Sequence, residues 1–357
     1  MAINIYSHAQ LTTAPSGGNK KATVGEQIGL TKVIINYDRP AVKGREGKIW
    51  GQLVHTGFVD QGFGSSKAAP WRAGANENTT IEFSTDVIIE GKPLAAGKYG
   101  FFIAWDAAEP TIIFSKNSGA WGSYYYNESE DALRVKVKAK PADRSVEWLK
   151  YEFIDQTDNS ATIALLWEKI IIPFKVEVNL VKAQIESYRQ ELQTRKGFRW
   201  DAWNEAAAYA VQNNTNLQEA LLWADSATSS TFGGNTQFQA WSTKAQVLEK
   251  LGRGKEAEAI MKRYLPLANM NEVHGYARQL LASGKKKEAL EVFKSNHEKY
   301  PNQFTTVFGL VRGYSGNADY ANALKYAKLA LPLVPNGPSK VQVEGAIKKL
   351  EEGKDIN

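Results

Sequence analysis

The chain has 357 residues, with 44 basic and 38 acidic side chains and no cysteine. Its length suits two domains. The lack of cysteine excludes disulfides, thiolate nucleophiles, iron–sulfur clusters and cysteine-based zinc sites. No apolar run reaches the roughly 18 residues that a membrane-spanning helix needs, so we expect no membrane span.

The net charge of +6 lies entirely in the second half of the chain. Residues 1–178 carry 20 basic and 20 acidic side chains, whereas residues 179–357 carry 24 and 18. This excess is modest, and no RNP, helix-turn-helix or zinc-finger motif accompanies it. We therefore expect no nucleic-acid partner.

The first nine residues end in a small-x-small pattern, Ser7-His8-Ala9, which Gln10 follows. This pattern is typical of a signal-peptidase site at the end of an apolar segment. We expect residues 1–9 to be the remnant of a signal peptide that is cleaved near Ala9-Gln10, and the protein to be periplasmic or secreted. A short unstructured N-terminus is the alternative.

Residues 10–178 are expected to form an antiparallel β-sandwich or jelly-roll-like domain. Short alternating or β-branched runs are separated by turn residues, and no helical pattern is long enough for a crossover between parallel strands. The expected strands cover residues 32–37, 79–83, 86–89, 99–104, 111–114, 133–138, 146–153, 161–167 and 171–178.

After residue 178 the hydrophobic period changes to that of a helix. Val181, Ile185, Tyr188 and Leu192 are spaced by 4, 3 and 4 residues, which predicts a connecting helix within residues 179–198. Alanine-rich helical patterns continue to the end of the chain. Four alanines that each follow a glycine or asparagine turn recur at intervals of 37, 32 and 34 residues, and they are Ala220, Ala257, Ala289 and Ala323.

A period near 34 residues with a small residue at a close helix contact is typical of tetratricopeptide repeats. We expect an all-α superhelical domain at residues 199–352, with repeats at 200–226, 236–268, 270–301 and 303–335 and a capping helix at 340–352. An ordinary helical bundle is the alternative. Such repeats stack into a curved array, whose concave face is expected to bind a protein or peptide. The lysines at 285–287 and 348–349 suit an acidic peptide, or form a solvated surface.

Few residues are available for catalysis or metal binding. The four histidines, at positions 8, 55, 274 and 297, are scattered, and no Walker loop, nucleophile elbow, dinucleotide fingerprint or HExxH motif occurs. We expect no metal, no cofactor and no enzyme of a common class. The one enzyme chemistry for which residues are available is catalysis by paired carboxylates, as in hydrolases or lyases that act on glycans. Glu77 is a weak catalytic candidate for it, with Asp86 or Glu82 as its partner.

Candidate ligand-binding residues are concentrated between residues 39 and 121. Guanidinium, indole and amide groups build sites for carbohydrates and carboxylates. The carbohydrate hypothesis predicts that the Trp, Arg, Asn and Glu side chains share one exposed concavity. In the alternative, Arg72 pairs with Glu77 and the tryptophans form core. The candidates are Arg39, Lys43, Arg45, Trp50, Trp71, Arg72, Asn76, Glu77, Lys116 and Trp121.

Many short strings in this part of the chain resemble the domain of unknown function 2911 over about residues 12–178. They include Tyr37-x-Arg39-Pro40, Trp71-Arg72-x-Gly74-Ala75-Asn76-Glu77, Gly91-Lys92-x-Leu94-x-Ala96-Gly97 and Trp167-Glu168. The resemblance implies an exported protein of the Bacteroidetes type, often with tetratricopeptide repeats behind the β domain, and it supplies no activity. The stretch His55 to Pro70 looks longer than the usual link between the tryptophan motifs.

Taken together, these features predict an exported binding or scaffold protein. Its β domain would recognise a ligand or partner, and its repeats would hold a protein. A carbohydrate-binding protein is one alternative, and a carboxylate-dependent hydrolase or lyase acting on glycans is the other.

Overall fold

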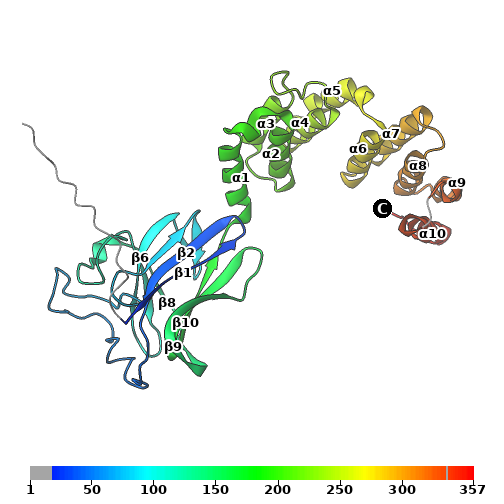
Figure 1. The fold of residues 1–357 in the computed structure, drawn as a ribbon. Helices are drawn as coiled ribbons and strands as arrows, with labels where there is room; N and C mark the ends of the chain where they lie inside the picture. The colour runs from blue at the N-terminus through cyan, green and yellow to red at the C-terminus, as the bar shows by residue number, and fades with distance from the viewer. Residues whose placement is uncertain (1–17, 335–336) are drawn as a thin grey trace, which may run out of the picture. The chain divides into compact units, whose positions relative to one another are not determined.

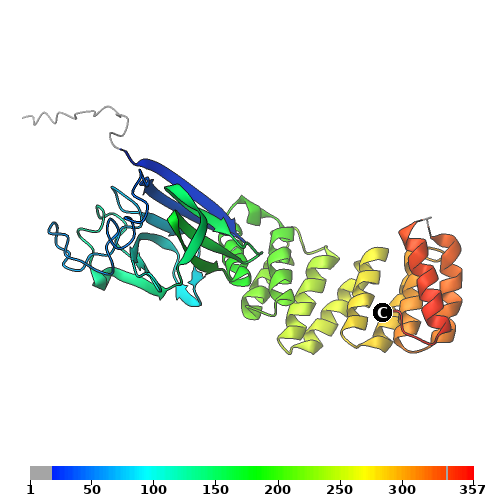
Figure 2. The ribbon, with the colours of Figure 1, turned by 90° about the horizontal axis from the view of Figure 1, so that it is seen from below.

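The computed structural model describes residues 18–334 and 337–357, so the expected signal-peptide remnant lies outside the described residues. The chain divides into two compact units, Met1–Glu186 and Ser187–Asn357 (Figure 1, Figure 2). The first unit contains the strands and the second contains nearly all the helices, which confirms the predicted fold class.

The first unit is a sandwich of two antiparallel sheets. A six-stranded sheet has the order β1-β2-β3-β6-β7-β8, and a four-stranded sheet has the order β5-β4-β10-β9. The strands are β1 Lys20–Ile28, β2 Thr31–Arg39, β3 Thr80–Phe83, β4 Val87–Ile89, β5 Lys92–Leu94, β6 Gly97–Ala104, β7 Thr111–Ser115, β8 Asp131–Lys136, β9 Lys140–Ile154 and β10 Ser160–Glu177.

Two of these strands were not expected from the sequence. β1 is a largely exposed edge strand with few apolar residues, and β5 has three residues, one of which is a proline. The expected strands at 161–167 and 171–178 form the single strand β10, whose pairing with β9 is irregular around Glu168. Glu168 has a left-handed backbone, and its buried carboxylate accepts a hydrogen bond from the Gly47 N–H.

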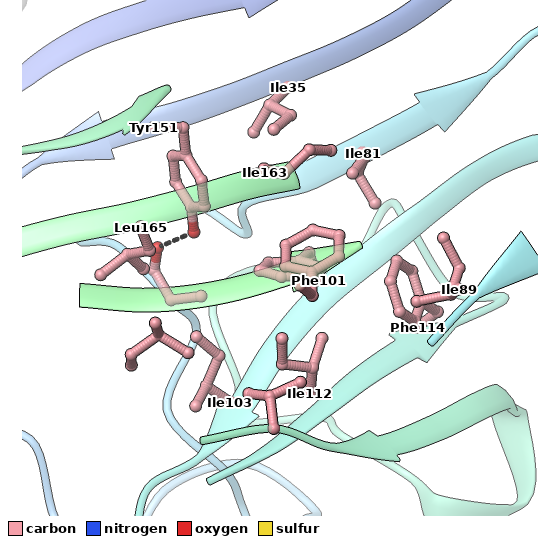
Figure 3. Close-up of a cluster of buried hydrophobic side chains, with 14 of the residues drawn as sticks. Ile35, Ile81, Ile89, Phe101, Ile103, Ile112, Phe114, Tyr151, Ile163 and Leu165 are labelled. Atoms are coloured by element: carbon pink, nitrogen blue, oxygen red, sulfur yellow. Dashed lines mark hydrogen bonds between the residues drawn. The ribbon is translucent and has the colours of Figure 1, made fainter. Parts of the chain in front are cut away.

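The core lies between the two sheets. In β2, Val33, Ile35 and Tyr37 point inward, as the two-residue alternation requires. Figure 3 shows side chains from both sheets meeting in this core, among them Phe101 and Phe114 of the larger sheet and Ile163 of the smaller one. The hydroxyl of Tyr151 donates a hydrogen bond of 2.7 Å to the Ala73 carbonyl, and burial raises the pKa of Tyr151 well above its usual value.

The second unit consists of helix pairs that follow one another along the chain. α1 (Leu180–Glu191) contains the boundary between the units. Four pairs then follow, namely α2 Trp200–Gln212 with α3 Leu217–Ala227, α4 Phe238–Lys250 with α5 Gly254–Tyr264, α6 Met270–Ala282 with α7 Lys286–Lys299, and α8 Phe304–Gly316 with α9 Tyr320–Ala330. α10 Pro338–Glu351 packs on α9. Among the described residues, no helix is long and apolar enough to cross a membrane.

The small residues at the helix contacts have the role that the sequence predicts. Ala220, Ala257, Ala289 and Ala323 are each at most 1% exposed, and they lie near the start of the second helix of each pair. The first helices of successive pairs also contact one another, α2 with α4, α4 with α6 and α6 with α8. A surface shared by the first helices therefore runs along the unit.

Candidate functional site

The outer face of the six-stranded sheet carries a row of small polar residues. Thr23, Asn36, Thr80, Gly100 and Ser115 lie opposite one another across β1, β2, β3, β6 and β7. Gly100 has no side chain, so the middle of this row is depressed. A side chain from the loop before β3 fills the depression, because a Cβ at Gly100 would lie 2.7 Å from Asn78 Nδ2.

A cleft of about 420 Å³ opens over this part of the sheet. We call it the outer-face cleft. Its walls come from β1, β2, the loop before β3, β6 and the loop after β7. It is lined by Lys21, Ala22, Thr23, Asn36, Tyr37, Asp38, Glu77, Asn78, Thr80, Lys98, Ser118, Gly119, Ala120 and Trp121.

The loop before β3 is anchored over β2 through Asp38, whose side chain is 3% exposed. Asp38 Oδ1 accepts a hydrogen bond of 3.3 Å from Asn76 Nδ2, and the Asp38 carbonyl accepts one of 3.1 Å from the Ala75 N–H. Asn76 has a left-handed backbone with φ of 50°, which asparagine tolerates better than most residues. These contacts fix the positions of Glu77 and Asn78.

Asn78 carries an unsatisfied amide at the cleft. Its Oδ1 and Nδ2 are both buried, and neither has a hydrogen-bond partner among the described residues. Buried polar groups are nearly always paired, and an unpaired one costs about 1–3 kcal/mol. The amide therefore lies at the base of the cleft, shielded from solvent, with its donor and its acceptor unpaired.

Charges in the outer-face cleft are balanced. Lys21 Nζ lies 2.7 Å from Glu77 Oε2, and it is directly opposite Asp38 in the strand register. The hydrogen bond that Lys21 donates to Glu77 and the negative charges of Glu77 and Asp38 raise the pKa of Lys21. With Lys98 the lining contains two ammonium groups and two carboxylates, so it suits a neutral ligand rich in hydroxyl groups.

Trp121 forms an aromatic wall of the cleft and is 52% exposed. Its ring is parallel to that of Tyr124, with centroids 5.7 Å apart. The guanidinium of Arg72 lies 5.4 Å from the Trp121 ring and 5.0 Å from the Tyr124 ring, and its Nη1 donates a hydrogen bond of 2.6 Å to the Asn76 carbonyl. Arg72 thus supports the Trp121 wall. Glu77 pairs with Lys21 and not with Arg72, which is its partner in the alternative interpretation.

Two of the predicted tryptophans lie elsewhere. Trp71 is 7% exposed and packs with Trp167 at a centroid distance of 6.0 Å. Trp50 contacts Trp71, Trp105 and Trp167, with centroids 5.6, 4.4 and 5.9 Å away. These four rings form a tryptophan cluster in the core. The predicted sharing of one exposed concavity is therefore wrong for Trp50 and Trp71.

Of the other predicted basic residues, the two arginines donate hydrogen bonds to backbone carbonyls and the two lysines are exposed. Arg39 Nε donates a hydrogen bond of 2.7 Å to the Leu149 carbonyl, and Arg45 Nη2 donates one of 2.7 Å to the Ala41 carbonyl. Lys43 and Lys116 are exposed and do not line the outer-face cleft. The structure therefore brings together Asn76, Glu77, Arg72 and Trp121 and separates them from the other candidates.

The carboxylates expected to act with Glu77 also lie outside the cleft lining. Asp86 is held by Lys182 at 2.8 Å and by the Ala96 N–H at 2.9 Å, and these hydrogen bonds lower its pKa. Glu82 is directly opposite Lys98 in the register of β3 and β6. The cleft instead combines Glu77 with Asp38. In the described part of the chain, no group of three potential metal ligands occurs.

Several lining residues were not expected from the sequence. Lys21 lies on the unexpected strand β1, and Asn36, Asp38 and Lys98 lie within strands. Only the strand register, which places Lys21 opposite Asp38 and Thr23 opposite Asn36, shows that these residues meet. Asn78 directly follows the Trp71–Glu77 string, yet no pattern in the sequence marks its amide as buried.

The family comparison agrees with the predicted resemblance. The family described as "Protein of unknown function (DUF2911)" matches residues 19–176, which include every strand of the sandwich except the last residue of β10. The β domain is therefore the part of the chain that is similar to this family. None of the curated proteins compared matches the chain.

Some of the solved structures that are similar to the chain are described as TPR proteins. YrrB, described as a TPR protein with an unusual peptide-binding site, is 16% identical, with 48% of this chain and 87% of that chain covered and a TM-score of 0.29. The putative kinesin light chain of Podosopora anserina, with nearly identical TPR-like repeats, is 16% identical, with 45% and 89% covered and a TM-score of 0.34.

A third similar structure is the APC/C hetero-tetramer Cut9-Hcn1. It is 15% identical, with 48% of this chain covered and a TM-score of 0.33. The chain spans only 33% of the length of that relative. Within this chain, the paired helices and the buried alanines at a period near 34 residues are the features typical of tetratricopeptide repeats.

Proposed function

We propose that the protein is an exported binding or scaffold protein with two recognition surfaces. The TPR-like unit holds a partner protein, and the β domain recognises a polar ligand in the outer-face cleft. Export is supported by the signal-peptidase pattern that ends at Ala9, which lies outside the described residues. Cell fractionation followed by N-terminal sequencing tests export. Protein that is found in the cytoplasm with residues 1–9 still attached would contradict it.

The observation that carries the protein-binding role is a set of side chains at equivalent positions of the first helices. The fifth residues of α4, α6 and α8 are Ser242, His274 and Phe308, and the ninth residues are Gln246, Arg278 and Arg312. Ser242 and Phe308 are buried, so His274 and the three ninth residues form the accessible part. We call this surface the first-helix face. Residues four apart lie on one side of a helix, and Gln246 already joins α4 to α6 by donating a hydrogen bond of 3.1 Å to Gln279.

Site-directed photo-crosslinking in the native cell tests this role with the full chain. A photoreactive amino acid is placed at Gln246 on the first-helix face, and a matched one at the exposed residue Glu258 of α5. We expect a discrete crosslinked protein from position 246 and none from position 258. Equal crosslinking from both positions, or none from position 246, would contradict partner binding on this face.

Carbohydrate binding is the second candidate function, and the combination of Asn78 and Trp121 favours it. A sugar presents an apolar ring face that stacks on indole and hydroxyl groups that pair with amides. The balanced charges of the cleft suit such a neutral ligand. The ion pair between Glu77 and Lys21 occupies the catalytic candidate, so binding is favoured over hydrolysis or elimination.

A panel of immobilised glycans tests this second candidate. We expect the full-length protein to bind a subset of the panel, and Trp121→Ala and Asn78→Ala to weaken binding about tenfold or more. Tyr125→Ala is the matched control, because Tyr125 is an exposed aromatic residue that does not line the cleft. Binding that Trp121→Ala leaves unchanged would place the glycan elsewhere.

A further inference from the structure

Two arginines occupy the same position in successive repeats. Arg278 of α6 and Arg312 of α8 are 34 residues apart, and each is the ninth residue of its helix. α6 and α8 contact one another. The residue just before each arginine, Ala277 or Val311, is completely buried, which fixes the direction in which the helix presents the arginine. The repeat therefore places both guanidiniums on the first-helix face.

Two cationic side chains lie close together at this place. Arg312 is half-buried, and its guanidinium lies 5.2 Å from the centre of the Phe308 ring. Among the described residues, neither Arg278 nor Arg312 forms an ion pair with a carboxylate. Burial and the charge of Arg278 lower the pKa of Arg312, and burial with both arginines lowers the pKa of His274 to about 4. A half-buried cation beside a second cation is stabilised by an anionic ligand.

Residues 355–357 of this chain are hydrogen-bonded to α8 at Arg312 and Ser315. The Ile356 N–H donates a hydrogen bond of 3.1 Å to Ser315 Oγ, and Asn357 Nδ2 donates one of 3.1 Å to the Arg312 carbonyl. Ser315 Oγ also lies 2.7 Å from Asp355 Oδ1. Arg312 Nη1 donates to Asn357 Oδ1 over 3.4 Å. That acceptor is a neutral amide at the limit of hydrogen-bond length, so most of the guanidinium's donors remain available.

We propose that Arg278 and Arg312 together bind the carboxylate of an aspartate or glutamate side chain in an extended peptide of a partner protein. The proposal rests on the proposed protein-binding function and adds the chemistry of the partner. Guanidinium groups bind carboxylates through paired, charge-assisted hydrogen bonds. The site differs from the lysine-rich turn at residues 285–287, where Lys285 already pairs with Glu249.

Selection from a random twelve-residue peptide library, displayed without phosphorylation, tests the proposal. The full-length protein is the bait, and the affinities of selected peptides are measured by fluorescence anisotropy. We expect enrichment of Asp or Glu at one fixed position of the selected peptides. We expect Arg278→Gln and Arg312→Gln each to weaken binding about tenfold or more, and replacement of the selected acid by Asn or Gln to weaken it equally.

Three controls make the result specific. Lys262→Gln, at an exposed residue of α5, is expected to leave affinity unchanged, as is Lys286→Gln combined with Lys287→Gln in the turn. In the Arg278→Gln protein the acidic and the neutral peptide are expected to bind alike. Selected peptides without an enriched acid, or unchanged affinity in both arginine variants, would overturn this proposal. Arg278 is exposed, so its variant is expected to fold even where Arg312→Gln does not.

The two proposals fail in different ways. Peptides that bind the first-helix face without an acidic preference would leave the protein-binding role intact and reject the carboxylate site. Loss of binding only in the Lys286 and Lys287 variant would move the site to the turn between α6 and α7. Failure of photo-crosslinking at Gln246 would reject the protein-binding role itself.

Discussion

Gly100 of β6 provides the space in which the Asn78 side chain lies. A Cβ at Gly100 would come within 2.7 Å of Asn78 Nδ2 and 2.5 Å of the Asn117 carbonyl oxygen, both too close for unstrained packing. The base of the outer-face cleft therefore depends on the absence of a side chain in the sheet and on an amide from a loop above it.

Gly100→Ala is expected to destabilise the protein by about 1–3 kcal/mol, because the new methyl group forces Asn78 and the residue 117 backbone to move. Gly119→Ala is the matched control, since nothing lies within 4 Å of a Cβ at that position. Urea unfolding of the full-length proteins measures both changes. Equal stability of the two variants would show that Gly100 is not tightly packed.

Trp167→Ala is expected to cost about 3–5 kcal/mol, because a large, fully buried ring is lost from the tryptophan cluster. Trp121→Ala is expected to cost only about 0.5–1 kcal/mol, the usual contribution of an exposed cation–π contact. Urea unfolding measures the difference. Similar losses in the two variants would contradict the division of the tryptophans into core and cleft wall.

Asn269→Ala is expected to lower the free energy of unfolding by about 1 kcal/mol, because Asn269 caps α6. Its side chain accepts hydrogen bonds from the backbone of Asn271 and Glu272, and the Glu272 side chain accepts one from the Asn269 N–H. Asn271→Ala, at the second residue of α6, is the control and is expected to have little effect, because only its backbone N–H takes part in the cap. Thermal unfolding at pH 7 distinguishes the two.

Stability is expected to fall as the pH is lowered from about 6.5 to about 4, partly because of His274. Burial and the charges of Arg312 and Arg278 lower its pKa to about 4 in the folded state, whereas its ordinary pKa is 6.5. Between these values the unfolded chain binds a proton that the folded chain does not, so acid favours unfolding.

Urea unfolding at several pH values measures this dependence. His274→Gln is expected to have a flatter profile between pH 6.5 and 4 than the unchanged protein. Arg312→Gln is expected to raise the pKa of His274, because one repelling positive charge is removed. Identical profiles for the unchanged protein and His274→Gln would show that His274 does not contribute.

The fold was predictable because its signals are local and repeated. Alternating residues such as Val33, Ile35 and Tyr37 mark inward positions of a strand, and the alanines from Ala220 to Ala323 mark each helix contact. The weak signal of β1 reflects its place at a sheet edge, where few side chains are buried.

The candidate site was only partly predictable, because it depends on which strands lie side by side. Glu77 and Trp121 were found from their residue types, whereas Asp38 and Lys21 meet only through the pairing of β2 with β1. Trp71 carries the same local signal as Trp121, yet one is core and the other lines the cleft. Residue type alone does not separate the two, since indole suits both environments.

The two proposed recognition surfaces should respond differently to ionic strength, because the charges that line the outer-face cleft are balanced. Salt screens attraction between a charged site and a charged ligand, but it hardly affects a neutral ligand among paired charges. Glycan binding beside Lys21 and Glu77 should therefore persist in salt concentrations that release an acidic peptide from Arg278 and Arg312. Washing a complex with concentrated salt would then remove the partner protein and leave the β domain loaded.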